Sequence, residues 1–268
     1  MTTTSIHALP ARRRTWQFYA AWAALFFILA VSVTAVRIDI RVLRDLPQAL
    51  WHYTVLMFAH PDWTKLTEAI FQTWRSVAMA WVGTLVGVVV STVLGVLAAN
   101  TVSPAWVRLP LRWLFAIIRA VPAIIVAILI LTVTGLTPFT GALALAISGI
   151  GTHAKWTYES LETAPTGPAE AVKAAGGNLV ETIRWGIWPL VKPELASLAL
   201  YRFEINVRAS AVLGLIGVGG IGDMLTGYTQ YRTWDVVGVL LIVVIVVTMT
   251  IDAVSGSLRR AIVAPRKT

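Results

Sequence analysis

Two long stretches of this chain contain no charged side chain. Residues 76–107 and residues 121–154 have no Asp, Glu, Lys or Arg. Each stretch exceeds the ~18 apolar residues that suggest a bilayer span. A helix satisfies its backbone hydrogen bonds internally, as hydrocarbon requires. We therefore expect an all-α, polytopic membrane helical bundle.

The composition supports this class and excludes others. The 268 residues are 57% hydrophobic and 13% charged, against about 25% charged in soluble proteins. Five or six spans with short connections would use the whole length, so no soluble catalytic domain fits. The net charge of +9 could indicate nucleic acid, but excess Lys and Arg also mark cytoplasmic loops of membrane proteins. We expect no nucleic-acid partner.

Metal and thiol chemistry have little support. The chain has no cysteine and four histidines, which excludes disulfides, thiol catalysis and cysteine-ligated metals. The histidines are scattered without metal-ligand spacing. His52 and His60 share a predicted outer loop, where a weak metal site stays open, but we assign no metal residues.

The first 65 residues form one predicted region: a tail, a first transmembrane helix and an external segment. Three arginines at 12–14 precede Trp16–Val36, which is uncharged. Residues 33–35 resemble a signal-peptide cleavage site, but the apolar part exceeds the usual 7–15 residues. We favour a retained helix. Residues 37–75 are polar and rich in tryptophan, which is typical of a segment at the headgroup level.

Residues 66–258 are the predicted transmembrane domain, and residues 259–268 are a basic tail. Gly83, Gly87, Ser91 and Gly95 recur every four residues, which lets a neighbouring helix approach closely. Residues 121–154 predict a helical hairpin broken at 135–141. The fifth and sixth spans are predicted at Leu195–Val218 and Val236–Ile251, which gives about six spans.

Charge asymmetry predicts the topology. Outside the proposed spans, 13 Lys and Arg residues fall on one side and 6 on the other. The richer side is the cytoplasmic one by the positive-inside rule. We expect a multi-pass protein of the cell (inner) membrane, with both termini and residues 165–194 in the cytoplasm.

The segment Pro165–Glu194 is the longest polar interval in the second half of the chain. Its charged and polar residues recur among apolar ones at helical spacing. Gly176 and Gly177 divide two predicted short helices, and Pro189 and Pro193 are expected to close the segment. The pattern predicts a structured loop that offers a helix to a soluble partner.

Several charged residues fall inside predicted spans, where each costs about 2.5–3.5 kcal/mol or more. Glu204 and Arg208 are four residues apart, in the favourable order for a structural ion pair. Arg202 and Arg119 have no local acidic partner, although Arg119 could extend to the inner surface. With Asn206 one turn above Arg202, these residues predict a path for an anion, and the candidates are Arg119, Arg202, Asn206 and Arg208.

Residues 217–222 satisfy the GxGxxG pattern. The dinucleotide fingerprint requires a strand, a turn and a helix in a soluble unit, whereas here the pattern ends a predicted membrane helix. We interpret it as a gate turn formed by Gly217, Gly219, Gly220 and Gly222. The chain has no P-loop lysine and no credible catalytic group, so we expect a non-enzyme without its own cofactor.

Part of the Pro165–Glu194 segment resembles a family signature. Glu170-Ala171, then Gly176 six residues after the glutamate and Pro189 thirteen further on, resemble the EAA signature of ABC-importer permeases. The sequence departs from that signature at three positions, which are Val172, Gly186 and Trp188. Residues 118–123 and 201–222 are similar to the phosphonate-type permeases of the binding-protein-dependent transport family. The resemblance covers roughly residues 66–258.

The resemblance implies a type I ABC-importer permease fold and ATP-driven import of phosphonate or a related phosphorus oxyanion. It implies a homodimer, an external substrate-binding protein, and two ATP-binding subunits that hold ATP and magnesium. The coupling residues implied are Glu170, Ala171, Gly176, Gly177 and Pro189. A permease for methionine or another small organic solute is the alternative within the class.

Two other classes stay open. A channel gated by the glycine turn would conduct without ATP and would not need the pattern from Glu170 to Pro189. A membrane scaffold without a pore would leave the charged residues inside the predicted spans unexplained.

Overall fold

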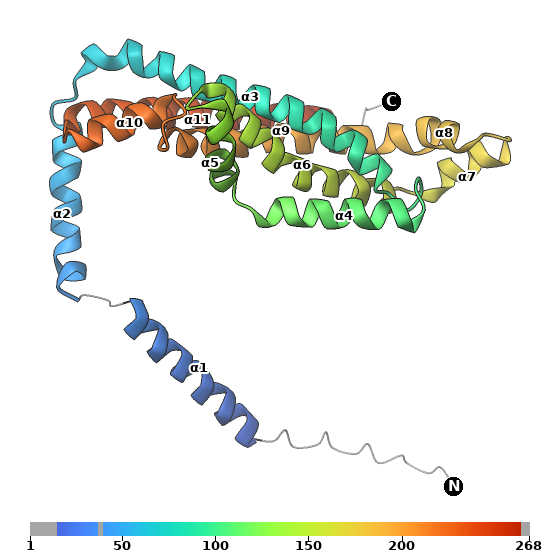
Figure 1. The fold of residues 1–268 in the computed structure, drawn as a ribbon, viewed down its shortest axis with the longest axis horizontal. Helices are drawn as coiled ribbons and strands as arrows, with labels where there is room; N and C mark the ends of the chain where they lie inside the picture. The colour runs from blue at the N-terminus through green and yellow to red at the C-terminus, as the bar shows by residue number, and fades with distance from the viewer. Residues whose placement is uncertain (1–14, 37–39, 264–268) are drawn as a thin grey trace, which may run out of the picture. The chain divides into compact units, whose positions relative to one another are not determined.

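The computed structural model describes residues 15–36 and 40–263, which are almost entirely helical (Figure 1). The chain divides into two compact units, residues 1–54 and residues 55–268. The first unit contains α1 (Thr15–Val36) and most of α2 (Ile40–Phe58), which includes Pro47. The predicted arginine-rich start and the last five residues of the basic tail lie outside the described residues.

The second unit contains the remaining helices. Four long ones run side by side: α3 (Leu66–Leu97), α6 (Pro138–Thr163), α9 (Trp188–Gly214) and α11 (Trp234–Val263) (Figure 1). Shorter elements connect them: a 3₁₀ turn (Trp63–Lys65), α4 (Ala105–Ala120), α5 (Ala123–Thr134), α7 (Thr166–Ala174), α8 (Leu179–Glu181), a π-helical turn (Thr182–Ile187) and α10 (Ile221–Gln230). The part of the chain that the structure describes contains no β-strand.

The predicted break in residues 121–154 is a short turn between α5 and α6. Gly135 has φ +73°, in the left-handed region that favours glycine. Thr137 then caps α6, because its Oγ1 accepts a hydrogen bond from the Thr140 N–H at 3.3 Å. Pro138 occupies the first turn, where its missing N–H costs nothing. The sequence signals for a helical break therefore act where they were predicted.

The predicted row of small residues lies on the contact between α3 and α6. A Cβ atom added at Gly83 would lie 2.7 Å from the Ala142 carbonyl oxygen, and one at Gly95 would lie 2.8 Å from that of Ala154. Ser91, in the same row, is fully buried. The prediction that this face admits a neighbouring helix is confirmed, and α6 is that neighbour.

The membrane class is confirmed, but the six predicted spans are not equally distinct. By length and apolar composition α1, α3 and α11 can each cross a bilayer. The helices α4 and α5, bent by 92°, would together make a fourth span. At 12 residues, α5 is too short alone for the ~20 residues that a span needs. Both α6 and α9 are long enough, but their polar residues keep them outside this apolar class.

The location of residues 37–75 at the headgroup level stays a prediction, whereas the structure gives their conformation. Most of them are helical, in α2, in the 3₁₀ turn and in the first ten residues of α3. Asp62 caps the 3₁₀ turn that precedes α3, because its Oδ1 accepts a hydrogen bond from the Thr64 N–H at 3.0 Å.

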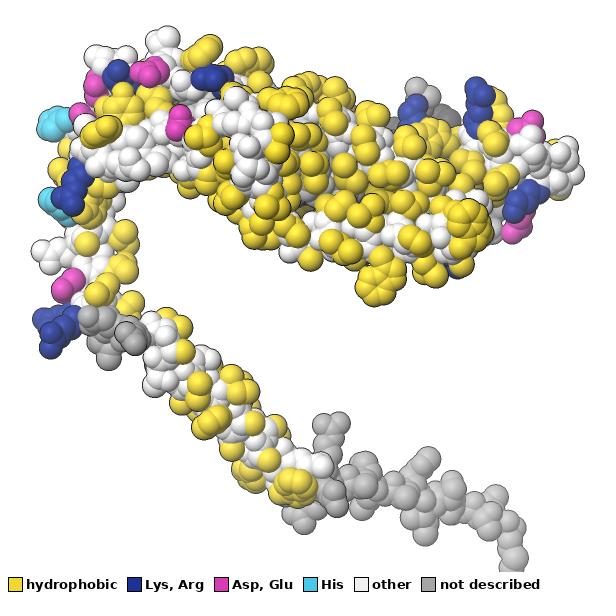
Figure 2. Space-filling view, in the orientation of Figure 1, with side chains coloured by type: hydrophobic (Ala, Val, Ile, Leu, Met, Phe, Trp, Pro, Cys, Tyr) yellow, Lys and Arg dark blue, Asp and Glu magenta, His cyan; other side chains and the backbone are white. Residues whose placement is uncertain are grey.

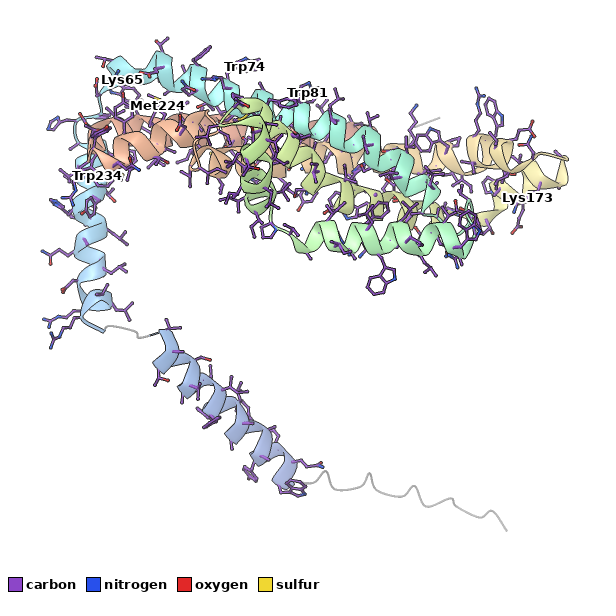
Figure 3. All side chains as sticks on the ribbon, in the orientation of Figure 1. Lys65, Trp74, Trp81, Lys173, Met224 and Trp234 are labelled. Atoms are coloured by element: carbon purple, nitrogen blue, oxygen red, sulfur yellow. The ribbon has the colours of Figure 1, made fainter. Side chains whose placement is uncertain are left out.

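Apolar side chains cover much of the outer surface of the second unit (Figure 2). On the visible face, most charged side chains of this unit gather toward its two ends. Trp74 and Trp81, labelled on α3 in Figure 3, are more than half exposed. An exposed apolar middle between charged ends is the pattern expected of helices in a bilayer.

The α3–α6 contact generates the first prediction. Replacing Gly83 or Gly95 with alanine would force the two backbones apart, and overpacking of this kind costs about 1–3 kcal/mol. The matched control is Gly227→Ala on α10, where an added Cβ meets nothing within 4 Å. We expect the first two variants to unfold in detergent at lower temperatures than the unaltered protein. The control variant should unfold at the same temperature as the unaltered protein. Equal temperatures for all three would contradict the tight contact.

Candidate functional site

A glycine pair ends α7. The N–H of Gly176 donates to the Lys173 carbonyl and that of Gly177 to the Val172 carbonyl, both at 2.9 Å. Gly176 has φ +87°, as expected of the left-handed residue that terminates a helix. Nothing lies within 4 Å of a Cβ added there, so the backbone conformation, rather than crowding, calls for glycine.

The next helix starts with a capping box. The Asn178 N–H donates to Glu181 Oε2 at 2.8 Å, and the Glu181 N–H donates to Asn178 Oδ1 at 3.0 Å. The helix then continues through the π-helical turn into α9. The prediction that Pro189 and Pro193 close this segment is wrong. Pro189 lies in the first turn of α9 and Pro193 lies inside it, so the helix runs on without a break.

The helix α7 packs directly on the π-helical turn. A Cβ added at Gly186 would lie 2.8 Å from the Cα of Ala169 and 3.1 Å from the Pro168 carbonyl oxygen. Ala169 and Ile187 are buried in this contact, whereas Glu170 is exposed. Lys173 lies on α7 at one end of the unit (Figure 3). The arrangement presents a short, exposed helix that is fixed to the base of α9.

The predicted coupling residues fall on this structure as a group. All but the half-buried Gly177 are exposed, and they are Glu170, Ala171, Gly176, Gly177 and Pro189. Gly186, which departs from the family signature, allows the π-helical turn to approach the backbone of α7 at Ala169 and Pro168. The sequence does not indicate this contact, because it depends on the position of the α7 backbone in the folded protein.

The predicted Glu204–Arg208 ion pair is wrong in its partners. Glu204 Oε1 forms an ion pair with Arg259 Nη2 at 2.9 Å, and Arg208 Nη2 donates to Asp252 Oδ2 at 2.7 Å. Both new partners belong to α11, which packs along α9. The spacing rule concerns neighbours on one helix, so it could not account for charges supplied by a second helix.

Sequence reasoning missed Asp252 and Arg259. They are seven residues apart, which places them on one face of α11 two turns from each other. That spacing in a strongly apolar helix was the available signal. The two pairs differ in exposure. The Glu204 and Arg259 side chains are 5% and 30% exposed, whereas those of Arg208 and Asp252 are 55% and 39% exposed.

Arg202 and Asn206 lie inside the bundle on another side of α9. Arg202 Nη2 donates to Ser148 Oγ of α6 at 3.5 Å, and Asn206 Nδ2 donates to Thr84 Oγ1 of α3 at 2.8 Å. Both side chains are buried. His153 of α6 is fully buried close to Arg202. These polar groups therefore join three helices.

Arg119 is separated from this cluster. It is the last basic residue of α4 and is exposed. Its Cγ would contact a Cβ added at Gly151 of α6, at 3.0 Å. Of the predicted path residues, Asn206 and Arg202 thus lie together in the interior, whereas Arg119 and Arg208 are each exposed elsewhere.

The glycine turn between α9 and α10 is closely packed. Gly217, Gly219 and Gly220 all have positive φ, so L side chains would be strained there. The Ile221 N–H donates to Ser76 Oγ of α3 at 3.0 Å, and a Cβ at Gly222 would overlap the Ala211 carbonyl oxygen. This turn follows a helix rather than a strand, so it lacks the context of a dinucleotide site.

The α9–α11 contact generates a prediction about stability. Arg259→Gln would remove the ion-pair partner of the buried Glu204 carboxylate; because Arg259 is 30% exposed, the cost should stay below the ~3–5 kcal/mol of a fully buried pair. Glu204→Gln should cost less, because Arg259 is partly exposed and also lies over the Tyr201 ring.

The two unfolding temperatures in detergent, measured on the separate variants, check this order. The double variant Glu204→Gln/Arg259→Gln should recover most of the loss. A larger loss from Glu204→Gln than from Arg259→Gln would contradict the assigned burial.

Comparison with known proteins shows the family. Residues 91–266 match the binding-protein-dependent transport system inner membrane component family. The phosphate-import permease protein PhnE of Mycolicibacterium smegmatis is 37% identical over 193 residues; the match covers 70% of this chain and 36% of that protein. The putative phosphite transport system permease protein HtxC of Stutzerimonas stutzeri is 30% identical, with 96% and 90% covered.

A solved structure supports the fold. An inward-facing form of the MetNI methionine ABC transporter contains a chain that aligns with a TM-score of 0.65 and 23% identity. The alignment covers 71% of this chain and 94% of that one. At this identity, the alignment shows the fold alone. Together with the family match, it leads to one conclusion: this multi-pass membrane protein belongs to the family of binding-protein-dependent transport system inner membrane components.

Proposed function

We propose that this chain is the permease subunit of an ATP-driven ABC importer for phosphonate, phosphite or a related phosphorus oxyanion. The two relatives described above are named for phosphate and phosphite transport. The structural neighbour is named for methionine, but its lower identity supports only the shared fold. The alternative of a methionine permease is therefore the weaker one.

The proposal includes partners. Two separate ATP-binding subunits hold ATP and magnesium, an external binding protein delivers the oxyanion, and a second copy of this chain completes the pore. Both termini lie in the cytoplasm, as the distribution of Lys and Arg favours. The exposed helix α7 then faces the ATP-binding subunits.

The single observation that carries the mechanism is the packing of α7 on the helix that becomes α9. Because Gly186 brings the two backbones together, a displacement of α7 moves the base of α9 with it. The continuous helix ends at the glycine turn, which is the proposed gate. Closure of the ATP-binding subunits would in this way change the side of the membrane to which the pore opens.

Arginines of α9 supply the positive charge that an oxyanion needs in low-dielectric surroundings. A planar guanidinium offers paired donors that match two oxyanion oxygens. Of the two arginines on α9, Arg208 is exposed and Arg202 is buried. Arg202 and Asn206 are buried and act from the interior of the bundle, while Arg119 belongs to the same path from α4.

Uptake by the reconstituted complex tests the substrate class. We expect the permease with its ATP-binding subunits and binding protein, in proteoliposomes, to accumulate phosphite, phosphate or methylphosphonate only with hydrolysable ATP. Methionine is the competing substrate. Accumulation of methionine instead would favour the alternative permease, and oxyanion flux without ATP would favour a gated channel.

Charge reversal on α7 tests coupling. Glu170 is exposed and suited to a basic surface, so Glu170→Lys should lower substrate-stimulated ATPase activity several-fold while the complex still assembles. Glu159→Lys is the matched control, since Glu159 is 47% exposed on α6 and pairs with Lys155 at 3.4 Å. Normal stimulation in Glu170→Lys, or an equal loss in the control, would mean that α7 is not the coupling element.

A further inference from the structure

The Arg208–Asp252 pair lies on an exposed stripe of two membrane helices. Arg208 is six residues before the end of α9, or about 9 Å along the axis, and Asp252 is eleven before the end of α11, or about 16 Å. The exposed neighbours on this stripe are apolar or aromatic: Tyr201, Val212, Leu215, Ile245 and Met249.

Exposure at this depth has a physical consequence. Charged side chains within membrane spans face a protein interior or a water-filled cavity rather than lipid. Of the other well-exposed ion pairs in the described residues, Lys65–Glu68 lies at the start of α3 and Lys155–Glu159 lies in the last nine residues of α6. The Arg208–Asp252 stripe must therefore face a partner or a polar path in the membrane.

A cavity opens beside this stripe. It has a volume of about 370 Å³ and lies between α3, α9, α10 and α11. Among the described residues that line it, Arg208 is the one with a charged side chain; the others are apolar apart from three hydroxyl groups, those of Thr73, Ser76 and Thr248. Thr73 and Ser76 are buried, and the Thr73 hydroxyl already donates to the Ala69 carbonyl. The Arg208 guanidinium is therefore the main donor that this largely apolar cavity offers to an anion.

The Asp252 carboxylate is itself an oxyanion, and it binds Arg208 as a substrate oxyanion would. Its Oδ2 accepts from Arg208 at 2.7 Å, while its buried Oδ1 has no hydrogen-bond partner in the described part of the chain. A guanidinium has five N–H donors, so this single contact leaves most of them for an oxyanion. Glu204 also interacts electrostatically with Arg208, but its ion pair is with Arg259 at 2.9 Å.

We propose that Arg208 is a transit site for the phosphorus oxyanion and that Asp252 is its resident counter-ion, which the passing oxyanion displaces. This inference rests on the proposed function. Without substrate, the pair is neutral and tolerable in the membrane. During passage, the carboxylate competes with the oxyanion, so binding stays weak and release is fast. A guanidinium without a counter-ion would instead retain the anion.

Three variants separate this role from a structural one: Arg208→Gln, Asp252→Asn and the double variant. All are assayed in the assembled complex in proteoliposomes, with phosphite and methylphosphonate as probes. Arg208→Gln should lower uptake at least tenfold. Asp252→Asn should raise phosphite binding to the complex, measured without the binding protein, about tenfold or more, and should slow uptake.

The neutral double variant decides the matter, because it removes both charges and leaves no unpaired one. We expect it to assemble and hydrolyse ATP but to transport as poorly as Arg208→Gln. Lys155→Gln/Glu159→Gln, which neutralises another exposed pair, is the control and should transport normally.

Two results would overturn the inference: restored uptake in the double variant, or unchanged phosphite binding in Asp252→Asn. Failure of the proposed function is a different result, in which the unaltered complex accumulates neither probe.

Discussion

The contact between α3 and α6 is the interaction on which the rest of the second unit depends. The hydrophobic effect contributes little to association between helices inside a bilayer, so close packing of the backbones must supply the attraction. Gly83 and Gly95 allow that approach because they lack a Cβ. The same two helices then hold α9, which bonds to Ser148 of α6 through Arg202 and to Thr84 of α3 through Asn206. Buried polar residues are tolerated in α9 because the packed helices α3 and α6 supply hydrogen-bond partners for them.

Charge is distributed over α9 according to what lies beside each face. Glu204 is buried and receives Arg259, whereas Arg208 is exposed and receives Asp252. A buried charge needs a partner from a neighbouring helix, and an exposed one within the membrane needs water or a ligand. The helix thus carries a buried pair that anchors it to α11 and, one turn further on, an exposed pair that we propose as a site of exchange.

Short-range patterns predicted much of this fold. The glycine row, the turn at Gly135 and the end of α7 at Gly176 each depend on one residue's own backbone or spacing, so the sequence alone indicates them. The partners of Glu204 and Arg208 could not be predicted, since they belong to a helix more than forty residues away in the chain. Likewise, Pro189 suggested a stop, but at the start of a helix proline is favoured rather than disruptive.

The π-helical turn at Thr182–Ile187 fixes an angle as well as a connection. A π-turn accommodates one extra residue in a helix, and one residue corresponds to a rotation of about 100° around the axis. The turn therefore sets the rotational phase between the face that meets Ala169 and the face that carries Arg208. Without the extra residue, a different side of α9 would face α11 while α7 kept its contact with the π-helical turn.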